Sequence, residues 1–430
     1  MRKITAAALV LLAVMLAITG CSKKEAASGG SSGGSGGTVT LRFWSHQNIP
    51  WNDSNEGFIA GFQKENPNIK IEYEAFPYED FEQKTQTSLL SKSGGADIYE
   101  LWGGWALDFT STGALAVVPD KFINELKADS YEPVLAAFNY NGKYYGVPIE
   151  FNAEYGGMLV LKPFFDSHNI KYPTTWNEMI SIAKANTVSR NNFFDVRGFD
   201  FLGADTMTYT YLSMILSKGG NYLEDGGHRF NFDTPIAREA LSTLRNYIVV
   251  DKITNLDGFT NTEGVEYGVF NGVTLQAPRG MWTIPTGKET YGVELGTDFD
   301  YIPSPFYGDQ KKWAAETGWG LVVNGGSAHQ EEAWKFVEYL LRPENILQNA
   351  IDRGNIPPRK SVARDPKYLA AVPFAKPVLD VLEGASFVGY INTDVMKNAI
   401  DNAFVDYVEG GASLDATITR INNELNEYAQ

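Results

Sequence analysis

Hydrophobic and polar positions follow a strand-then-helix pattern through the first part of the chain beyond residue 37. Residues 39–43 alternate and are rich in β-formers, residues 69–75 repeat the pattern, and residues 98–101 form a short apolar run, so each predicts a strand. Helical spacing between them predicts one helix opening at the capping-box sequence 53–56 and another over about residues 78–91. This order of strands and helices predicts a parallel, doubly wound sheet.

The rest of the chain carries the same two patterns, and helices dominate its last third. Asn141-Gly142 predicts a tight turn before a strand at 143–149. A second capping box at 175–178 and the sequence Asp233-Thr-Pro235 each predict the start of a helix. Apolar residues at helical spacing predict a further helix over 331–341.

Aromatic residues follow all three of the N-terminal predicted strands. Ligands of doubly wound sheets bind beyond the carboxyl ends of the strands. In this chain those positions hold Trp44, His46, Tyr78, Trp102 and Trp105. Aromatic rings pack against the apolar faces of sugar rings and leave the sugar hydroxyls free to hydrogen-bond. The sequence leaves open whether Trp102 and Trp105 form such a platform or belong to the core, where most tryptophans are largely buried.

The first 37 residues have the composition of a targeting segment and a linker. Two basic residues precede an apolar stretch at 4–18 that is too short to span a membrane, so residues 1–20 are predicted to be a signal peptide. Ile18-Thr-Gly-Cys21 resembles the lipobox of bacterial lipoproteins, and Cys21 is the only cysteine in the chain. Residues 21–37 are then the acylated cysteine and a flexible Gly/Ser linker. We expect an extracytoplasmic protein, lipid-anchored to a bacterial membrane at the cell surface or on the periplasmic side.

Length and charge narrow the classes of protein that the folded part can belong to. About 390 residues are too many for one ordinary core, so two domains are expected. The chain has 36 Lys and Arg against 52 Asp and Glu, a formal charge of −16. A duplex-binding protein needs a basic face, and therefore no nucleic-acid partner is expected.

Recognisable metal, cofactor and catalytic motifs are missing from the sequence. The four histidines, His46, His168, His228 and His329, are scattered without metal-ligand spacing. No glycine pair is followed by the Gly-Lys-Ser/Thr of a phosphate-binding loop, and no Gly-x-Ser-x-Gly stands before a predicted helix. We expect no metal, no cofactor and no catalytic residue.

A set of segments stands in a recognisable order along the chain after the linker. They are FWSH at the end of the first strand, FQKENPNIKIE, GGADIYELW, NGKYYGVPIE, PTTWNEMI, FNGVTLQAPRGMWTIP, TGWGLVVNGGSAHQEEAWKFVEYLLRPEN and RGNIPPRKS. In this order they resemble the extracellular solute-binding proteins of ABC importers, family 1, which includes maltose- and other oligosaccharide-binding proteins. The resemblance covers essentially the whole chain after the linker.

The resemblance implies a fold and its division into lobes. The fold is α/β and two-lobed, of the type II periplasmic-binding-protein kind, with each lobe a mainly parallel sheet flanked by helices and a hinge between them. The N-lobe would comprise residues 38–147 plus 304–350, and the C-lobe residues 148–303 plus 351–430. Closing the lobes around a ligand is a hinge motion. The chain would cross between lobes near Tyr145–Glu150, Tyr301–Pro305 and Asn349–Pro358.

The resemblance also implies which aromatic residues contact the ligand. Trp102 matches the aromatic residue that follows the third strand, and Trp105 lies just beyond it. Trp282 is the nearest match to a tryptophan that the C-lobe contributes, and Trp319 lies where the chain re-enters the N-lobe. Arg279 stands where the family has small residues, and it either forms a salt bridge within the protein or pairs with an acidic ligand.

Three polar residues after the first crossing are expected hydrogen-bond partners for sugar hydroxyls. They are Glu150, Asn152 and Glu154, and the match to the family does not choose among them. Carboxylates suit this task because each oxygen accepts more than one hydrogen bond.

The expected function is capture of a sugar, an oligosaccharide in the first place, for delivery to the transmembrane subunits of an ABC permease with separate ATPase subunits. The protein is expected to be a monomer and not an enzyme. One alternative keeps the fold and changes the ligand to a peptide, a polyamine or a phosphate ester. For a polyamine, acidic residues should outnumber neutral polar groups in the cleft. Another alternative is a lipid-anchored glycoside hydrolase, in which Glu150 and Glu154 would flank the scissile bond.

Overall fold

The chain divides into two units, Met1–Gly37 and Thr38–Gln430, and the fold given below is that of the second unit. The predicted signal peptide, the acylated Cys21 and nearly all of the linker lie outside the described residues. Within the described part, no helix is both long enough and apolar enough to cross a membrane. The computed structural model describes residues 37–91, 94–191, 193–203, 205–257, 259 and 264–429.

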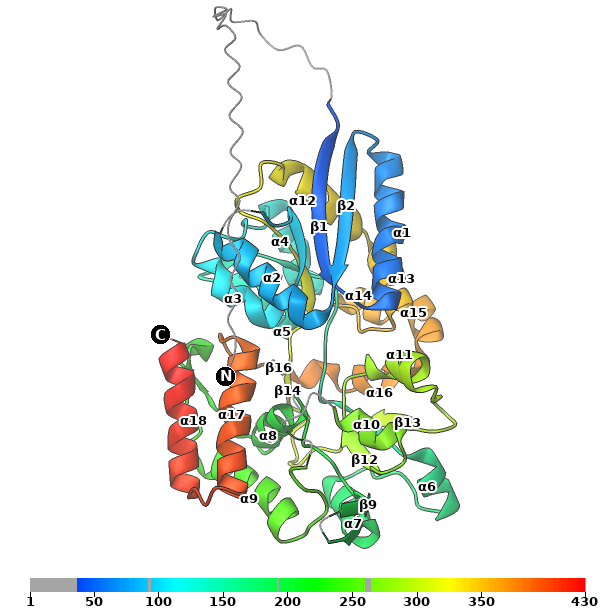
Figure 1. The fold of residues 1–430 in the computed structure, drawn as a ribbon, viewed down its shortest axis with the longest axis vertical. Helices are drawn as coiled ribbons and strands as arrows, with labels where there is room; N and C mark the ends of the chain where they lie inside the picture. The colour runs from blue at the N-terminus through cyan, green and yellow to red at the C-terminus, as the bar shows by residue number, and fades with distance from the viewer. Residues whose placement is uncertain are drawn as a thin grey trace, which may run out of the picture. The chain divides into compact units, whose positions relative to one another are not determined.

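A five-stranded sheet lies at the centre of the first half of the Thr38–Gln430 unit (Figure 1). Its strand order is β2-β1-β3-β15-β6. β1 (Val39–His46) pairs in parallel with β2 (Ile69–Phe76) and with β3 (Ile98–Trp102), so the predicted parallel arrangement of these three strands is confirmed. β15 (Trp319–Val323) is antiparallel to both β3 and β6 (Val147–Pro148).

The helix after β1 starts earlier than the sequence pattern predicts. α1 spans Ile49–Glu65, so the capping box expected at residues 53–56 lies inside the helix and is not its start. Pro50 occupies the first turn, where its missing N–H costs no hydrogen bond. The side chain of Asn52 accepts a hydrogen bond from the Asn48 N–H at 3.0 Å, so this backbone N–H just before the helix has a partner.

Five other helices complete the first half of the unit and its return segment. α2 spans the predicted residues 78–91, and α12 lies within one residue of the predicted 331–341 helix. α3 starts directly after β3, with Gly103-Gly104 as its first residues. The bounds are α2 (Tyr78–Ser91), α3 (Gly103–Thr110), α4 (Asp120–Asp129), α12 (Gln330–Leu340) and α13 (Pro343–Arg353).

The second half of the unit contains a smaller sheet with a different pairing. β7 (Gly157–Val160) lies between β12 (Gln276–Pro278) and β13 (Asp300–Pro303) and is antiparallel to both. Parallel pairing here joins β14 (Trp313–Ala315) to β16 (Ala385–Phe387). The expectation of a mainly parallel sheet in each lobe therefore applies to β1, β2 and β3 and not to this three-stranded sheet.

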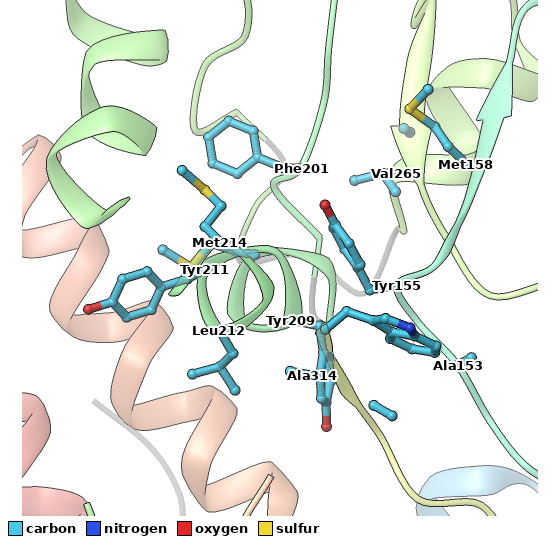
Figure 2. Close-up of a cluster of buried hydrophobic side chains, with 14 of the residues drawn as sticks. Ala153, Tyr155, Met158, Phe201, Tyr209, Tyr211, Leu212, Met214, Val265 and Ala314 are labelled. Carbon is cyan, nitrogen blue, oxygen red and sulfur yellow. The ribbon is translucent and has the colours of Figure 1, made fainter. Parts of the chain in front are cut away.

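One helix runs through the middle of the second half and is buried on all sides. Every residue of α8 (Thr206–Ser217) is buried, as expected of a helix enclosed by other elements. Figure 2 shows Tyr209, Tyr211 and Met214 of this helix among side chains from other segments, including Tyr155. α9 (Pro235–Val249) and α17 (Thr393–Val408) contact α8, and α18 (Leu414–Tyr428) packs beside α17.

Several local predictions in this half of the chain are confirmed. Thr175 and Glu178 form the predicted capping box at the start of α7 (Trp176–Asn186). Asn141 and Gly142 both have positive φ, as the predicted turn requires. The strand after that turn is shorter than 143–149, because pairing stops after Tyr144 and resumes at β6. The N-cap of α9 is Thr234.

The remaining elements are short. They are α5 (Glu132–Ala136), β4 (Asn139–Tyr140), β5 (Lys143–Tyr144), α6 (Lys162–Ser167), β8 (Val188–Arg190), β9 (Phe193–Val196), β10 (Leu223–Glu224), η1 (Asp225–Gly227), β11 (Arg229–Phe230), α10 (Val265–Phe270), α11 (Thr283–Thr286), η2 (Gly287–Tyr291), α14 (Lys360–Ala363), α15 (Pro366–Ala371), η3 (Pro373–Ala375), α16 (Lys376–Leu379) and η4 (Leu382–Gly384).

Two separate hydrophobic cores lie within the Thr38–Gln430 unit. The first core surrounds the five-stranded sheet and the second surrounds α8 and the smaller sheet. The chain passes from the first core to the second between Ile149 and Phe151, and returns between Ala315 and Trp319. This return lies later than the predicted crossing at Tyr301–Pro305, because β13 and β14 pack in the second core. After Ile346 the chain packs mainly in the second core; outside these stretches, Tyr131 and Val134 also belong to the second core and Val362 to the first.

Candidate functional site

A cavity of about 680 Å³ lies between the two cores. Ligand pockets typically have volumes of roughly 300–1,000 Å³. The cavity borders both the strand ends of the first core and polar segments of the second. Its lining residues are His46, Asn48, Pro50, Trp51, Tyr78, Glu82, Trp102, Glu150, Asn152, Glu154, Asp205, Arg279, Trp282, Pro285, Thr286, Glu289, Glu316, Trp319, Arg353, Asp394, Lys397 and Asn398.

The first core presents an aromatic wall to the cavity, which we define as His46, Trp51, Trp102 and Trp319. His46 ends β1, Trp102 ends β3 and Trp319 starts β15, so the sheet brings the three together at one edge. The His46 and Trp319 rings stack with centroids 4.1 Å apart, and Trp102 meets Trp319 at 5.5 Å in an edge arrangement. Trp51, from α1, lies edge-on to His46 at 4.9 Å.

A buried ion pair lies behind the aromatic wall. Arg353 donates to Glu100 at 2.7 Å and to the side-chain oxygen of Asn55 at 2.8 Å. Its guanidinium group also lies 4.7 Å from the Trp51 ring centre, within the range of a cation–π contact. Burial lowers the pKa of His46 to about 4, so the imidazole beside this pair is neutral at pH 7.

The second core presents a charged wall, which we define as Glu154, Asp205, Arg279, Glu316 and Lys397. Arg279 follows β12 and donates to Glu154 and to Asp205, both at 3.1 Å. Lys397, on α17, contacts Asp205 at 2.8 Å and Glu316 at 3.5 Å. Burial by itself would raise the pKa of Asp205, but the charges of Lys397 and Arg279 outweigh burial and lower it.

For two other carboxyl groups of the cavity, burial outweighs the neighbouring cation. Burial raises the pKa of Glu150 to about 8, and that of Glu316 likewise to about 8. Glu150 accepts from the Trp319 N–H at 3.3 Å and from the Asn355 amide at 3.0 Å, and both donors are neutral. At pH 7 a large share of each of these two groups is therefore protonated.

Trp282 is held in the cavity by the charged wall. Its indole N–H donates to Glu154 at 2.6 Å, and the Arg279 guanidinium lies 4.8 Å from its ring centre. Asn152 donates to the same Glu154 oxygen at 2.9 Å. Trp282 is partly exposed, so this ring offers the cavity a surface that the protein itself does not cover.

Hydrogen bonds join the two cores at one end of the cavity. Trp102 donates through its indole N–H to Thr393 at 3.2 Å, and Trp105 donates to Asp394 at 2.6 Å. Gly104 allows this approach, because a Cβ atom there would lie 2.0 Å from the Thr393 hydroxyl. The two tryptophans separated by two glycines are thus a contact between α3 and the start of α17.

A second pair of inter-core bonds lies further along α3. Asp108 accepts from the Asn392 amide at 2.6 Å and from the Tyr428 hydroxyl at 2.7 Å. The side-chain oxygen of Asn392 caps the start of α17 at the same time. The structure therefore has the two cores in direct contact around the cavity.

Most of the residues expected at the site border the cavity. Trp44 and Trp105 do not. Trp44 packs edge-on against Phe76 and Tyr99, and Trp105 is fully buried against Tyr78 and Asp394. The expected residues that line the cavity are His46, Tyr78, Trp102, Glu150, Asn152, Glu154, Arg279, Trp282 and Trp319.

Several lining residues were not predicted from the sequence. Trp51 lies inside α1, whose start was predicted too late at residue 53, so its position next to His46 was not recognised. Asp205, Glu316 and Lys397 are far apart along the chain and carry no motif. Only the packing of α8, α17 and the β14–β15 segment brings them together. Arg279 forms salt bridges within the protein, one of the two roles left open for it.

Metal ligation finds no support in the described residues. Among them, no group of three or more His, Cys, Asp and Glu side chains has the arrangement to hold a metal ion. The acidic residues of the cavity contact basic and amide groups instead.

A family comparison and related sequences agree with this architecture. Residues 52–346 match the model of the family "Bacterial extracellular solute-binding protein". A putative binding protein of Brucella abortus is 24% identical over 366 residues, which cover 82% of this chain and 85% of that protein. The "Multiple sugar-binding protein" of Streptococcus mutans is 24% identical over 384 residues, covering 84% and 83% of the two chains.

Solved structures share the fold. The sugar-binding protein MalE of Xanthomonas citri has a TM-score of 0.72 at 23% identity, covering 91% of this chain and 97% of that one. A solute-binding protein of Thermotoga lettingae bound with α-D-tagatose has a TM-score of 0.75 at 20% identity, covering 91% and 100%. The class defined by fold and cavity is that of two-lobed α/β binding proteins. The chain belongs to the bacterial extracellular solute-binding protein family of ABC transporters, and the predicted family and fold class are confirmed.

Proposed function

We propose that this protein binds a sugar, an oligosaccharide in the first place, in the cavity between the two cores. The observation that carries the proposal is the pairing of an aromatic wall with carboxylate and amide groups around one cavity of about 680 Å³. Four tryptophans, Trp51, Trp102, Trp282 and Trp319, border that space. Flat rings pack on the apolar faces of pyranoses, and oxygen acceptors orient their hydroxyls.

Relatives whose names refer to sugars support the same ligand class. They include a "Maltotriose-binding protein" of Pyrococcus abyssi and the Streptococcus mutans protein. Binding would end in delivery of the sugar to the transmembrane subunits of an ABC permease. ATP would be hydrolysed by separate subunits. In this proposal the protein acts as a monomer, tethered to the extracytoplasmic side of the membrane through Cys21.

Closure of the two lobes is the proposed way in which the sugar is enclosed. The inter-core hydrogen bonds of Trp102 and Asp108 are the contacts that such a closure would make. Opening would break them and expose both walls of the cavity. A hinge motion of this kind lets the ligand in and gives a permease two distinguishable states.

Two of the alternatives are disfavoured by the contacts of the charged residues. In a glycoside hydrolase Glu150 and Glu154 would act as acid and base. Here Glu154 is bonded to Arg279, Trp282 and Asn152, and Glu150 is bonded to Trp319 and Asn355. A phosphate ester would need an available cation, and Arg279 is surrounded by three carboxylates.

Tryptophan fluorescence of the purified full-length chain, titrated with mono- and oligosaccharides, tests the proposal. A saturable change with one sugar, together with a higher melting temperature in its presence, is the expected result. Absence of both signals with every sugar would overturn sugar binding. Release of free monosaccharide from an oligosaccharide would overturn the proposed lack of catalysis.

A further inference from the structure

The cavity contains many more acidic than basic side chains. Three described lining residues, Arg279, Arg353 and Lys397, are cationic. Asn and Thr contribute four neutral polar side chains. The excess of acidic over neutral groups is the pattern that a cationic solute requires. The carboxylate-bearing lining residues are Glu82, Glu150, Glu154, Asp205, Glu289, Glu316 and Asp394.

All three cationic groups are already engaged by carboxylates of the protein. Arg279 contacts Glu266 at 2.8 Å in addition to Glu154 and Asp205. The three N–H groups of Lys397 face three carboxylates, at 2.8, 2.8 and 3.5 Å. Arg353 is paired with the fully buried Glu100. An anionic ligand would find no free positive charge among these groups.

Glu316 is the least satisfied of the acidic groups. It is 2% exposed, and Asn152 donates to one of its oxygens at 3.4 Å. The other oxygen meets no donor in hydrogen-bond geometry; the Tyr209 hydroxyl is near Glu316, and the ammonium of Lys397 is 3.5 Å from this oxygen. A buried carboxylate without an adequate counter-charge is costly, so the group either takes a proton or awaits a cation.

Both charged and polar groups surround the carboxyl groups of Glu150 and Glu316. Glu316 is near Lys397, Asp205, Glu154 and Tyr209. Glu150 is near Arg353 and Glu100, and its own hydrogen bonds come from Trp319 and Asn355. The raised pKa values of about 8 follow from burial first and from the like charges second. Both groups can therefore release a proton when a positive charge arrives.

We propose that the ligand carries a protonated amino group, as an amino sugar does, and that the carboxylates of the charged wall, Glu316 above all, hold this group. This inference rests on the proposed sugar-binding function and narrows its ligand class. The ammonium group supplies the positive charge that the wall lacks, and the sugar ring packs on the tryptophans. Aromatic faces also attract cations, so both walls favour the same ligand.

The direct test compares sugars that differ in one substituent. Isothermal titration of the full-length chain would use the β-1,4 disaccharides of glucose, glucosamine and N-acetylglucosamine, the three monosaccharides, and spermidine. These sugars carry a hydroxyl, an ammonium or an acetamido group at the same carbon. We expect the amino sugar to bind at least about tenfold more tightly than its neutral counterparts, with an affinity that falls as salt is added.

Each outcome separates this inference from the proposed function. A neutral sugar that binds as tightly as its amino counterpart would overturn the amine assignment and leave sugar binding standing. Binding of spermidine without binding of any sugar would support the ammonium site and overturn sugar as the ligand. Binding of neither amine would overturn the inference.

Matched substitutions locate the ammonium group. Glu316→Gln keeps the shape of the side chain and removes its charge, and it should lower amine affinity at least about tenfold while neutral-sugar affinity changes little. Glu56→Gln removes the same charge at an exposed position of α1 that does not line the cavity and should leave amine affinity nearly unchanged, because water and salt screen it. Equal effects of the two substitutions would overturn the role of Glu316. Glu150→Gln is the second variant if Glu316→Gln does not fold.

The dependence on pH is an independent readout. Spermidine keeps its amino groups largely protonated up to pH 8, so its affinity should rise from pH 6 to pH 8 as Glu150 and Glu316 lose their protons, and this rise should flatten in Glu316→Gln. A neutral sugar should show no such rise. A flat pH profile for the amine in the unmodified protein would contradict the proposed contact.

Discussion

The aromatic wall and the charged wall of the cavity are built on different physical principles. The aromatic wall stands on strand ends of the five-stranded sheet and on α1, and its rings are fixed by packing against each other, with His46 and Trp319 stacked at 4.1 Å. The charged wall draws its members from segments far apart in the chain, and its geometry depends on opposite charges such as Arg279 and Glu154. The aromatic wall therefore depends on how its rings pack together, and the charged wall depends on how its acidic and basic groups neutralise each other.

The two walls should respond differently to solution conditions. Ring packing depends on buried apolar area and changes little with pH or salt. A buried ion network depends on the protonation of every member, and the loss of one charge leaves its partners uncompensated. Four experiments test this difference between the two walls.

The largest effect is expected when the charged wall loses its central cation. Arg279→Met leaves Glu154 and Glu266 buried without their cationic partner and leaves Asp205 with Lys397 alone, which should cost about 3–5 kcal/mol of unfolding free energy. Urea unfolding at pH 7 measures it. Arg190→Met is the matched control, because Arg190 pairs with Asp195 on the surface and should cost at most about 1 kcal/mol. Equal losses in the two variants would contradict the network.

A substitution in the aromatic wall should weaken ligand binding and should have little effect on how protein stability depends on pH. Trp102→Ala removes one ring from the wall and should weaken sugar binding by about 1–3 kcal/mol. Calorimetric titration with the sugar identified by fluorescence measures this loss. Trp102→Phe keeps one aromatic ring, although a smaller one, and removes the N–H that bonds Thr393 at 3.2 Å, so it should retain more of the affinity than Trp102→Ala. Unchanged affinity in Trp102→Ala would show that the ring does not touch the sugar.

The contribution of Glu150 and Glu316 to the stability of the ligand-free protein should fall as the pH rises from about 4.5 to 8. Glu150 and Glu316 have a pKa near 8 in the folded state and an ordinary value of 4.5 when unfolded. In that window the folded state binds more protons, so the free energy of unfolding decreases as pH increases and levels off above pH 8. Glu150→Gln removes this contribution. Its melting temperature relative to the unmodified protein should therefore rise between pH 5 and pH 8, and a constant difference would contradict the shifted pKa.

The smallest effect is expected at the contact between the cores. Asp108→Ala removes the acceptor of Asn392 and Tyr428, and each lost hydrogen bond should cost the closed form about 0.5–1.5 kcal/mol. Small-angle scattering of the ligand-free protein should then report a larger radius of gyration. Glu56→Ala, an exposed change on α1, is the control and should leave the radius unchanged. An unchanged radius in Asp108→Ala would mean that other contacts hold the cores together.

Local sequence signals predicted the first half of the fold well. The alternation in 39–43 and 69–75 predicted β1 and β2, and the apolar run at 98–101 predicted β3, because strand patterns need only neighbouring residues. Thr175 and Glu178 predicted a helix start for the same reason. The predicted start of α1 was wrong because the sequence contains two start signals close together. Pro50 lies in the first turn of the helix, whereas residues 53–56, which have capping-box spacing, lie inside the helix and cannot cap its end.

Features that depend on contacts between distant parts of the chain could not be predicted from the sequence. The proline-rich stretch near 303–305 has the composition of a crossing, yet Trp313 beyond it is fully buried in the second core. Trp105 lies two glycines beyond Trp102, yet it packs against Tyr78 and donates to Asp394 and does not border the cavity.

The sequence by itself determined the family, the order of the first strands and helices, and the edge of the sheet at which His46 and Trp102 would meet. These follow from periodicity and from motifs in neighbouring residues. Tertiary structure alone decided which acidic groups face the cavity and which cations neutralise them. Asp205, Glu316 and Lys397 are separated by 81 to 192 positions along the chain. Their charges interact because the packing of the second core brings them close together and buries them.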